Sequence, residues 1–356
     1  MRNELTDRLG LEYPIIQAPM AGGVTTSELV AAVSNKGALG MIGAGYMSPS
    51  GLRDQIRDIK KRTSNLFGIN LFVPSPFSST QEDIQHAQEL LKPFRTQLKL
   101  EEQEINIPDC EQEAETFAQL IDIVLEEKIG VCSFTFGLPS GEVIKRLKAH
   151  GVVLIGTAAT VREAIEAERS GMDMVVVQGC EAGGHRGAFL PDAKESMIGL
   201  MSLIPQAVDS IEIPVIAAGG IMDGRALMAA RCLGAKGVMM GTAFLTCSES
   251  GASSVHKKAV LEAREDEIVM TRAFSGKWAR GVHNRFIEEM KHSQLDVPVF
   301  PVQNTLTKAI RSASSSQGNP DCMSLWSGQS PMLAKEQTAA QLIDSVTEQA
   351  QRILNW

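Results

Sequence analysis

The sequence lacks a long apolar run, clustered cysteines and an excess of positive charge, and each absence excludes a class of protein. No stretch of about 18 apolar residues occurs, so a membrane-spanning helix is not expected. None of the six cysteines forms a C-x-x-C pair, which favours reduced thiols in a cytoplasmic protein over a disulfide framework. No apolar signal core follows the N-terminal residues, so a secretion signal is not expected either. The net charge of −8 argues against nucleic acid or a membrane surface as a partner.

What the chain does contain is a repeated alternation of apolar runs and amphipathic stretches. The runs are nearly all apolar, as in a parallel sheet buried on both faces, and eight of them predict an α/β fold of the (β/α)8 TIM-barrel type. A doubly wound open sheet fits the same alternation, but no G-x-G-x-x-G follows the first run. The predicted strands cover 13–20, 39–43, 67–72, 131–136, 152–157, the run from 174, 213–221 and 237–242.

Two regions interrupt this alternation. Residues 74–108 are rich in proline and polar residues and predict an insertion at the face where the strands end, with a charged helix at 82–91. After the eighth strand, 249–330 predicts a lid subdomain over the barrel mouth, with helices at 254–263 and 284–291 and a serine-rich polar loop at 312–319. The predicted division is therefore a barrel domain at 1–248, a lid at 249–330 and, within 331–356, a final helix that packs on the barrel.

The candidate catalytic residue is His185, which follows the sixth apolar run. Gly183, Gly184 and Gly187 surround it and would allow a ligand to approach the backbone closely. An imidazole at a barrel mouth can accept a proton from carbon, because its ordinary pKa lies near neutrality. The alternative is a loop histidine that is hydrogen bonded to a carbonyl group. We favour the catalytic interpretation, because chemistry in barrels is placed where strands give way to loops.

Glycines after the last two strands predict a phosphate site. Gly219 and Gly220 end the seventh strand, and Met239, Met240, Gly241 and Thr242 end the eighth. In such barrels these two loops and a short helix N-terminus commonly bind phosphate through backbone N–H groups. The side-chain amides of Asn70 and Gln178 also follow strand cores, and they suit either the mixed edge of a flavin ring or an internal hydrogen bond.

Other polar residues have weaker assignments. Histidines 86, 150, 256 and 292 lie on polar or helical stretches and are predicted to be exposed, whereas His283 could line the lid. Glu181 could orient His185 or face solvent, and Arg186 is expected to form an ion pair within its loop. No His, Cys, Asp and Glu cluster has metal-ligand spacing, so no metal is expected.

These motifs together resemble the nitronate monooxygenase family, also called 2-nitropropane dioxygenases. The matching segments, spread over residues 10–246, are PIIQAPMAG (14–22), FGIN (67–70), QGCEAGGHRG (178–187), PVIAAGGI (214–221) and MGT (240–242). The resemblance implies a detoxifying oxidoreductase that holds FMN and oxidises an alkyl nitronate with O2 to a carbonyl compound and nitrite. It also implies that His185 is catalytic. The cofactor-binding residues it implies are Ala18, Met20, Gly22, Asn70, Gln178, Gly183, Gly184, Gly219, Gly220, Met239, Met240, Gly241 and Thr242.

Two alternatives stay open at this point. The same glycine motifs resemble FMN-dependent enoyl-ACP reductases, which use NAD(P)H, although the 74–108 insertion and the long segment after 249 fit the monooxygenases better. A flavin-binding protein without catalysis is the other alternative. The sequence names no physiological nitronate and leaves homo-oligomer formation open.

Overall fold

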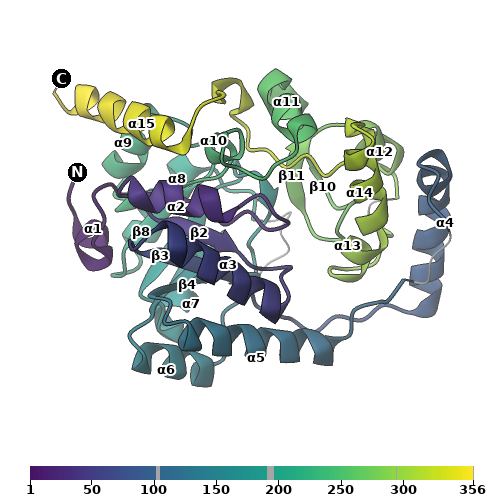
Figure 1. Ribbon diagram of the computed structural model, residues 1–356, viewed down its shortest axis with the longest axis horizontal. Coiled ribbons are helices and arrows are strands. Elements are labelled where there is room, and N and C mark those ends of the chain that lie inside the picture. The colour runs from purple at the N-terminus through teal and green to yellow at the C-terminus, as the bar shows by residue number, and fades with distance from the viewer. Residues whose placement is uncertain (102–104, 191–195, 294, 356) are drawn as a thin grey trace.

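The main body of the molecule is a barrel of parallel strands surrounded by helices (Figure 1). The structure is a computed structural model, and it describes residues 1–101, 105–190, 196–293 and 295–355. Eight strands form one sheet in the order β1-β9-β8-β6-β5-β4-β3-β2. A parallel bridge between Ile16 and Leu39 joins β1 to the segment just before β2, so the sheet closes on itself. The predicted TIM barrel is therefore confirmed, and the open-sheet alternative is excluded.

Each predicted strand is present, although most are shorter than expected. Several predicted ends belong to turns or loops, because the inter-strand pairing stops at the barrel mouth. The strands are β1 (Ile15–Gln17), β2 (Gly40–Gly43), β3 (Phe67–Phe72), β4 (Val131–Thr135), β5 (Val153–Ala158), β6 (Met174–Gln178), β8 (Val215–Ala218) and β9 (Gly237–Met240).

Side chains of the strands alternate between two hydrophobic clusters. One set, including Met41, Ile155 and Val176, fills the barrel interior, and the N-terminal helix α1 (Glu4–Leu9) adds Leu5 and Leu9 to that cluster. The other set packs outward against the helices. At the carboxyl ends of the strands the inward positions become polar, and this change opens the mouth to a ligand.

Helices follow the strands as the alternation predicts. Thr26 caps the first of them, since its hydroxyl accepts a hydrogen bond from the backbone N–H of Leu29 at 3.0 Å, and Gly171 ends α7 in the left-handed conformation. The helices around the barrel are α2 (Ser27–Asn35), α3 (Pro49–Arg62), α5 (Cys110–Glu126), α6 (Gly141–Ala149), α7 (Val161–Ser170), α8 (Leu200–Val208), α9 (Gly224–Cys232), α10 (Thr242–Leu245) and α15 (Ala339–Leu354).

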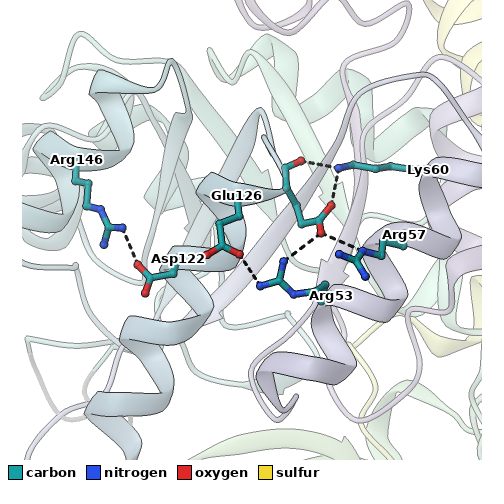
Figure 2. Close-up of polar contacts among 7 residues, drawn as sticks. Arg53, Arg57, Lys60, Asp122, Glu126 and Arg146 are labelled. Atoms are coloured by element: carbon teal, nitrogen blue, oxygen red, sulfur yellow. Dashed lines mark hydrogen bonds and ion pairs between the residues drawn. The ribbon is translucent and has the colours of Figure 1, made fainter.

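The outer flank of the barrel carries a network of ion pairs between α3 and the end of α5 (Figure 2). The carboxylate of Glu127 lies 2.9 Å from Lys60 Nζ and 3.2 Å from Arg57 Nε, and Arg53 reaches both Glu127 and Glu126. The cations hold the pKa of Glu127 below its ordinary value, with the Lys60 hydrogen bond as the largest cause. Because the arginines and Lys60 are largely exposed, the network orders the flank more than it stabilises the fold.

The insertion and the lid share a second hydrophobic core, separate from the barrel core. Its members come from the long helix of the insertion and from the lid, and Ile84, Leu91 and Phe94 pack there with Phe274 and Phe286. In Figure 1 the insertion helix stands beside the lid helices, far from α6 and α9. Residues 102–104 of the insertion lie outside the described residues. The elements of this region are α4 (Gln81–Gln97), α11 (Ser254–Glu262), α12 (Arg285–Glu289), α13 (Val302–Leu306) and α14 (Lys308–Ser316).

The predicted polar loop at 312–319 is wrong, because its first half is the end of α14. Serine has a modest helix propensity. The run Ser314, Ser315, Ser316 contains no apolar residue, so the helical periodicity that begins at Ile310 cannot be recognised in the sequence. Ile310 and Ser314 are fully buried against the second core, and this packing outweighs the propensity. Gly318 then follows in the left-handed conformation.

A small antiparallel sheet connects the lid to the barrel mouth. Its order is β10-β11-β7, with β10 (Ile268–Thr271) and β11 (Ala279–Val282) from the lid. The third strand, β7 (Gly184–His185), belongs to the segment that the sequence predicts as a loop after β6. His185 pairs with Ala279, and Gly184 pairs with Arg280. The candidate catalytic histidine is thus held by backbone pairing to the lid. Among the described residues, no helix is long and apolar enough to cross a membrane.

Candidate active site

Two adjoining cavities lie at the carboxyl ends of the strands. The inner cavity, of about 220 Å³, sits on the barrel mouth, and the outer one, of about 1330 Å³, lies between the barrel, the start of the insertion and the lid. His185, Phe72, Phe136 and Trp326 line both, so they form the boundary between the two spaces. A ligand in the inner cavity would therefore meet a second ligand from the outer cavity at His185.

Most residues that the sequence nominates gather around the inner cavity. Two do not: Gly22 lines the outer cavity, and the Met240 side chain packs outward against the helices at 1% exposure. The nominated residues that line the inner cavity are Ala18, Met20, Asn70, Gln178, Gly183, Gly184, His185, Gly219, Gly220, Met239, Gly241 and Thr242. They come from β1, β3, β6, β7, β8, β9 and the adjoining turns, and parallel pairing brings the ends of these strands to one rim.

Glycines form the floor of the inner cavity, and three of them have a positive φ, including Gly184 at +71°. Gly219 and Gly220 after β8 have φ values of +135° and +63°, which side chains rarely adopt. Gly183 has a different constraint: a Cβ there would lie 2.5 Å from the backbone N of Gly328. No lysine or arginine among the described residues lines this cavity. An anionic group bound here would therefore rely on backbone N–H groups.

The two nominated amides make defined hydrogen bonds at the mouth. Asn70 Nδ2 donates to Ser133 Oγ at 2.9 Å and to Thr135 Oγ1 at 3.0 Å, which ties β3 to β4. Gln178 Nε2 donates to the carbonyl of His185 at 3.0 Å, and its Oε1 accepts from the N–H of Gly187 at 2.8 Å. Gln178 therefore clamps both sides of the His185 segment while it also borders the cavity.

The His185 imidazole lies in an apolar enclosure with one polar contact. Its Nε2 is 2.8 Å from Ser275 Oγ, on the turn between β10 and β11. Its ring centroid lies 5.4 Å from that of Trp326 and 5.8 Å from that of Phe136. Burial, together with the nearby cations Lys277 and Arg311, lowers the pKa of His185 to about 3, and burial is the largest cause. The imidazole is therefore neutral over the physiological pH range, with a proton on one of its two ring nitrogens.

A buried arginine holds the loop around His185. Arg186 is fully buried and donates to the backbone carbonyls of Gly179 and Gln178, and also to that of Ser196. Burial lowers the pKa of Arg186 to about 10. The predicted ion pair of Arg186 is wrong for the described residues, because the loop carbonyls fold around the guanidinium and no described carboxylate reaches it.

The two carboxylates near this loop accept hydrogen bonds from backbone N–H groups. Glu163, fully buried on α7, accepts from Ala159 at 2.7 Å and from Leu190 at 2.8 Å. Glu181 Oε1 accepts from the N–H of Leu200 at 2.9 Å, so it caps α8, whose own N-cap residue is a glycine. Glu181 makes no hydrogen bond to His185. Its carboxylate caps α8, so it neither orients His185 nor simply faces solvent.

The lid supplies the cationic wall that the barrel lacks. Lys277 Nζ lies 4.6 Å from the centre of the Phe136 ring, and Arg311 on α14 lines the outer cavity with Lys308. Arg311 donates to the carbonyl and the side-chain oxygen of Asn304 but reaches no carboxylate among the described residues. Across the same cavity, the carboxyl of Glu113 on α5 has its pKa raised by desolvation. The outer cavity therefore favours an anionic ligand.

Sequence reasoning misses several residues of the site. Phe136 has a φ of +72°, a strained conformation for a residue other than glycine, and it follows β4 directly. Trp326 and Ser330 come from the segment before α15, and no motif indicates them. The predicted exposure of His256 is wrong: it is only 8% exposed, because Nε2 contacts the Trp326 carbonyl at 3.0 Å beneath the lid. His283 is exposed and pairs with Glu288, away from both cavities.

Comparisons with known proteins give one consistent family. A sequence model of the family described as nitronate monooxygenase matches residues 2–349. A probable nitronate monooxygenase from Staphylococcus haemolyticus is 52% identical over 354 residues, covering 99% of this chain and 98% of that protein. One from Staphylococcus aureus strain Newman is 50% identical over 356 residues, covering 100% of this chain and 99% of that protein.

Two solved structures resemble the chain over its whole length. Nitroalkane oxidase from Streptomyces ansochromogenes superposes with a TM-score of 0.91 at 35% identity and covers 99% of both chains. FabK from Thermotoga maritima superposes with a TM-score of 0.79 at 29% identity and covers 100% of this chain and 98% of that one. Both similarities extend through the lid as well as the barrel.

Proposed function

Since this chain belongs to the nitronate monooxygenase family, whose members are oxidoreductases and generally depend on a flavin, we propose that its flavin is FMN. We further propose that it oxidises alkyl nitronates with O2 to carbonyl compounds and nitrite. The observation that carries this proposal is His185, whose neutral imidazole lies between a glycine-lined cavity and a cationic one. The inner cavity would hold the cofactor, and the outer cavity would admit the substrate.

The chemistry of the floor supports FMN. The turns after β8 and β9 contribute Gly219, Gly220, Gly241 and Thr242 to one cavity, so their backbone N–H groups would bind the phosphate. Asn70 and Gln178 border the same space and would meet the polar edge of the ring. Together with Ala18, Met20, Gly22, Gly183, Gly184, Met239 and Met240, these are the residues to which we assign the cofactor. When bound, FMN supplies the redox chemistry by accepting electrons from the nitronate and passing them to O2.

The lid wall provides the substrate side of the proposal. A nitronate is an anion, and Lys277 and Arg311 would attract it toward His185. The aromatic rings around His185 would exclude water from the reacting carbon. Where the substrate is a neutral nitroalkane, His185 would remove the proton from the carbon next to the nitro group. Where the substrate is already a nitronate, the imidazole would only position it.

The proposed roles also divide the chain. We assign FMN binding to the barrel at 1–248 and substrate access to the lid at 249–330. The segment at 331–356 carries α15, which packs against α2 and α9 on the outside of the barrel. We assign it a structural role.

The test is the anaerobic absorbance spectrum of the purified, flavin-loaded protein. We expect nitronate to change the flavin spectrum without a nicotinamide donor, and oxygen to restore it with release of nitrite. Bleaching by NADPH alone, with no response to nitronate, would overturn the proposal in favour of an enoyl-thioester reductase. The variant His185→Asn should keep its flavin and lose turnover, whereas a flavin-binding protein without catalysis would respond like the wild type.

A further inference from the structure

The hydroxyl of Ser275 makes three contacts at once, and their geometry restricts where protons can sit. Ser275 Oγ lies 2.8 Å from His185 Nε2 and 3.1 Å from the carbonyl oxygen of Lys277, and the N–H of Lys277 approaches it at 3.3 Å. Ser275 is only 1% exposed, so these partners are protein groups rather than bulk water. A hydroxyl has one proton to donate and two lone pairs that accept.

A count of donors and acceptors selects one arrangement. If the hydroxyl donates to the Lys277 carbonyl, its oxygen can accept from the Lys277 N–H and from a protonated Nε2 of His185, and every contact is satisfied. If Nε2 of His185 were instead the acceptor, one hydroxyl proton would have to serve two acceptors. His185 Nδ1 makes no hydrogen bond to any residue in the described part of the chain. The count therefore leaves Nδ1 as the nitrogen with an available lone pair.

We propose that Ser275 is a positioning residue that holds neutral His185 in the tautomer protonated at Nε2, so that Nδ1 is the base. The role of His185 as a base rests on the proposed function, whereas its tautomer does not. In the step, the proton on the substrate carbon moves to Nδ1, and the electron pair of the C–H bond passes into the nitronate. The imidazolium that results keeps its Nε2 hydrogen bond to Ser275, so the charge forms beside an oxygen that already accepts.

The lid holds Ser275 rigidly, as a positioning residue requires. Gln303 Nε2 donates to the carbonyl of Ala273 at 2.7 Å, and the Thr307 hydroxyl donates to the carbonyl of Phe274. Gly276 has a φ of +77° and lies so close to Pro298 that a Cβ would be 2.1 Å from its carbonyl oxygen. The turn that presents the hydroxyl is therefore fixed on both sides of Ser275 by α13 and α14 and by the 298–300 segment.

The direct test is the tautomer itself, read from nitrogen chemical shifts of the flavin-loaded protein labelled with ¹⁵N-histidine. The His185 signals are assigned by their loss in His185→Gln. We expect the wild type to carry the proton on Nε2, and Ser275→Ala to populate the other tautomer. A proton on Nδ1 in the wild type would overturn the proposal, and so would an unchanged tautomer in Ser275→Ala. This measurement needs no turnover, so its failure is distinct from failure of the proposed function.

A kinetic comparison separates positioning from simple loss of structure. Ser275→Ala should lower kcat/KM for neutral nitroethane by roughly 10- to 100-fold, because proton removal needs the correct tautomer. With ethyl nitronate, which needs no deprotonation, the same variant should stay within about twofold of the wild type. An equal loss on both substrates would mean that Ser275 only supports the fold.

The matched control is Ser314→Ala. Ser314 is another buried lid serine, and its hydroxyl donates to the carbonyl of Asn319 at 2.6 Å, away from His185. It should lower the stability of the lid by a similar amount but leave both the tautomer and the ratio of the two activities unchanged. If Ser314→Ala altered either readout as Ser275→Ala does, general loosening of the lid would replace the proposal.

Discussion

The two walls of the candidate site are built on different principles. The barrel floor consists of strand ends and the turns that follow them, with glycines, two amides and no described cation at the inner cavity. The lid wall consists of Ser275, Lys277, Phe300, Arg311 and Trp326, which carry hydroxyl, charge and aromatic surface. The floor is suited to grip a cofactor through its backbone, and the wall is suited to handle a substrate through side chains.

This difference predicts that changes in the two walls have separable effects. A change in the floor should release the flavin, and a change in the wall should alter substrate handling or pH response with the flavin still bound. His185 connects the two walls, because β7 leaves the barrel rim and pairs with β11 of the lid. The predictions below run from the largest expected effect to the smallest.

Gly183→Ala should distort the barrel floor and weaken flavin binding. The added Cβ would lie 2.5 Å from Gly328 N and from the carbonyl carbon of Ser327, both backbone atoms that cannot move away easily. Overpacking of this kind typically costs about 1–3 kcal/mol, so flavin affinity should fall by roughly 10- to 100-fold, as measured by fluorescence titration of the apoprotein. The matched control is Gly141→Ala, at the start of α6, where a Cβ meets nothing within 4 Å. Equal flavin affinity in both variants would contradict the prediction.

His256 should make the lid wall sensitive to acid. Burial lowers its pKa to about 4, although the Trp326 carbonyl opposes the shift, while the unfolded chain titrates near 6.5. The unfolded state therefore binds more protons between these values, and stability falls as pH falls from about 6.5 to 4. At pH 5 the free energy of unfolding should therefore be lower by about 2 kcal/mol than it is above pH 7.

The measurement for His256 is chemical denaturation of the wild type and His256→Gln at pH 7 and pH 5. A glutamine amide can still donate to the Trp326 carbonyl but does not titrate. The variant should therefore lose about 2 kcal/mol less than the wild type between the two pH values. An identical loss in both proteins would show that His256 does not link the lid to pH.

Arg311→Met should weaken substrate binding at the lid wall without changing flavin binding at the barrel floor. Removing a cation beside His185 should raise KM for nitronates by about tenfold and leave flavin affinity unchanged. Arg311→Lys, which keeps the charge, should recover part of the loss. The measurement is steady-state kinetics at low and high salt, since the wild type should lose more affinity in salt than Arg311→Met. Loss of flavin from Arg311→Met would break the division between the walls.

Arg57→Ala, on the outer flank of the barrel, should have the smallest effect. Its ion pair with Glu127 is exposed on the arginine side, so the free energy of unfolding should fall by less than about 1 kcal/mol. Flavin affinity, KM and kcat should equal those of the wild type. A larger change in activity would mean that the flank in Figure 2 communicates with the site.

Much of the floor was predictable because local sequence patterns determine it. In a parallel barrel every strand delivers its carboxyl end to the same rim, so residues such as Asn70, Gln178 and Gly219 converge once the strands are counted correctly. Helix ends were predictable for a similar reason, because Thr26 and Gly171 act on their own neighbours. The same rim places His185 at the mouth, whereas His256, which also lines both cavities, was predicted to be exposed.

The lid wall was not predictable, because its contacts join residues distant in the sequence. His185 and Ser275 are separated by 90 positions, and His256 and Trp326 by 70. Neither pair belongs to a local motif, and the serine-rich end of α14 even suggested a loop. These residues meet only after the insertion and the lid have formed their shared core around Phe274 and Phe286.

By itself, the sequence determined the barrel, the glycine-lined floor and the position of His185 at the barrel mouth, since strand periodicity and turn chemistry act over a few residues. Tertiary structure alone decided that the His185 imidazole contacts Ser275, and that Arg186 donates to carbonyl groups rather than to a described carboxylate. Burial and charge at a point depend on every segment that packs there. The electrostatic environment of His185 and Arg186 is therefore defined only after the lid has packed over the mouth of the barrel.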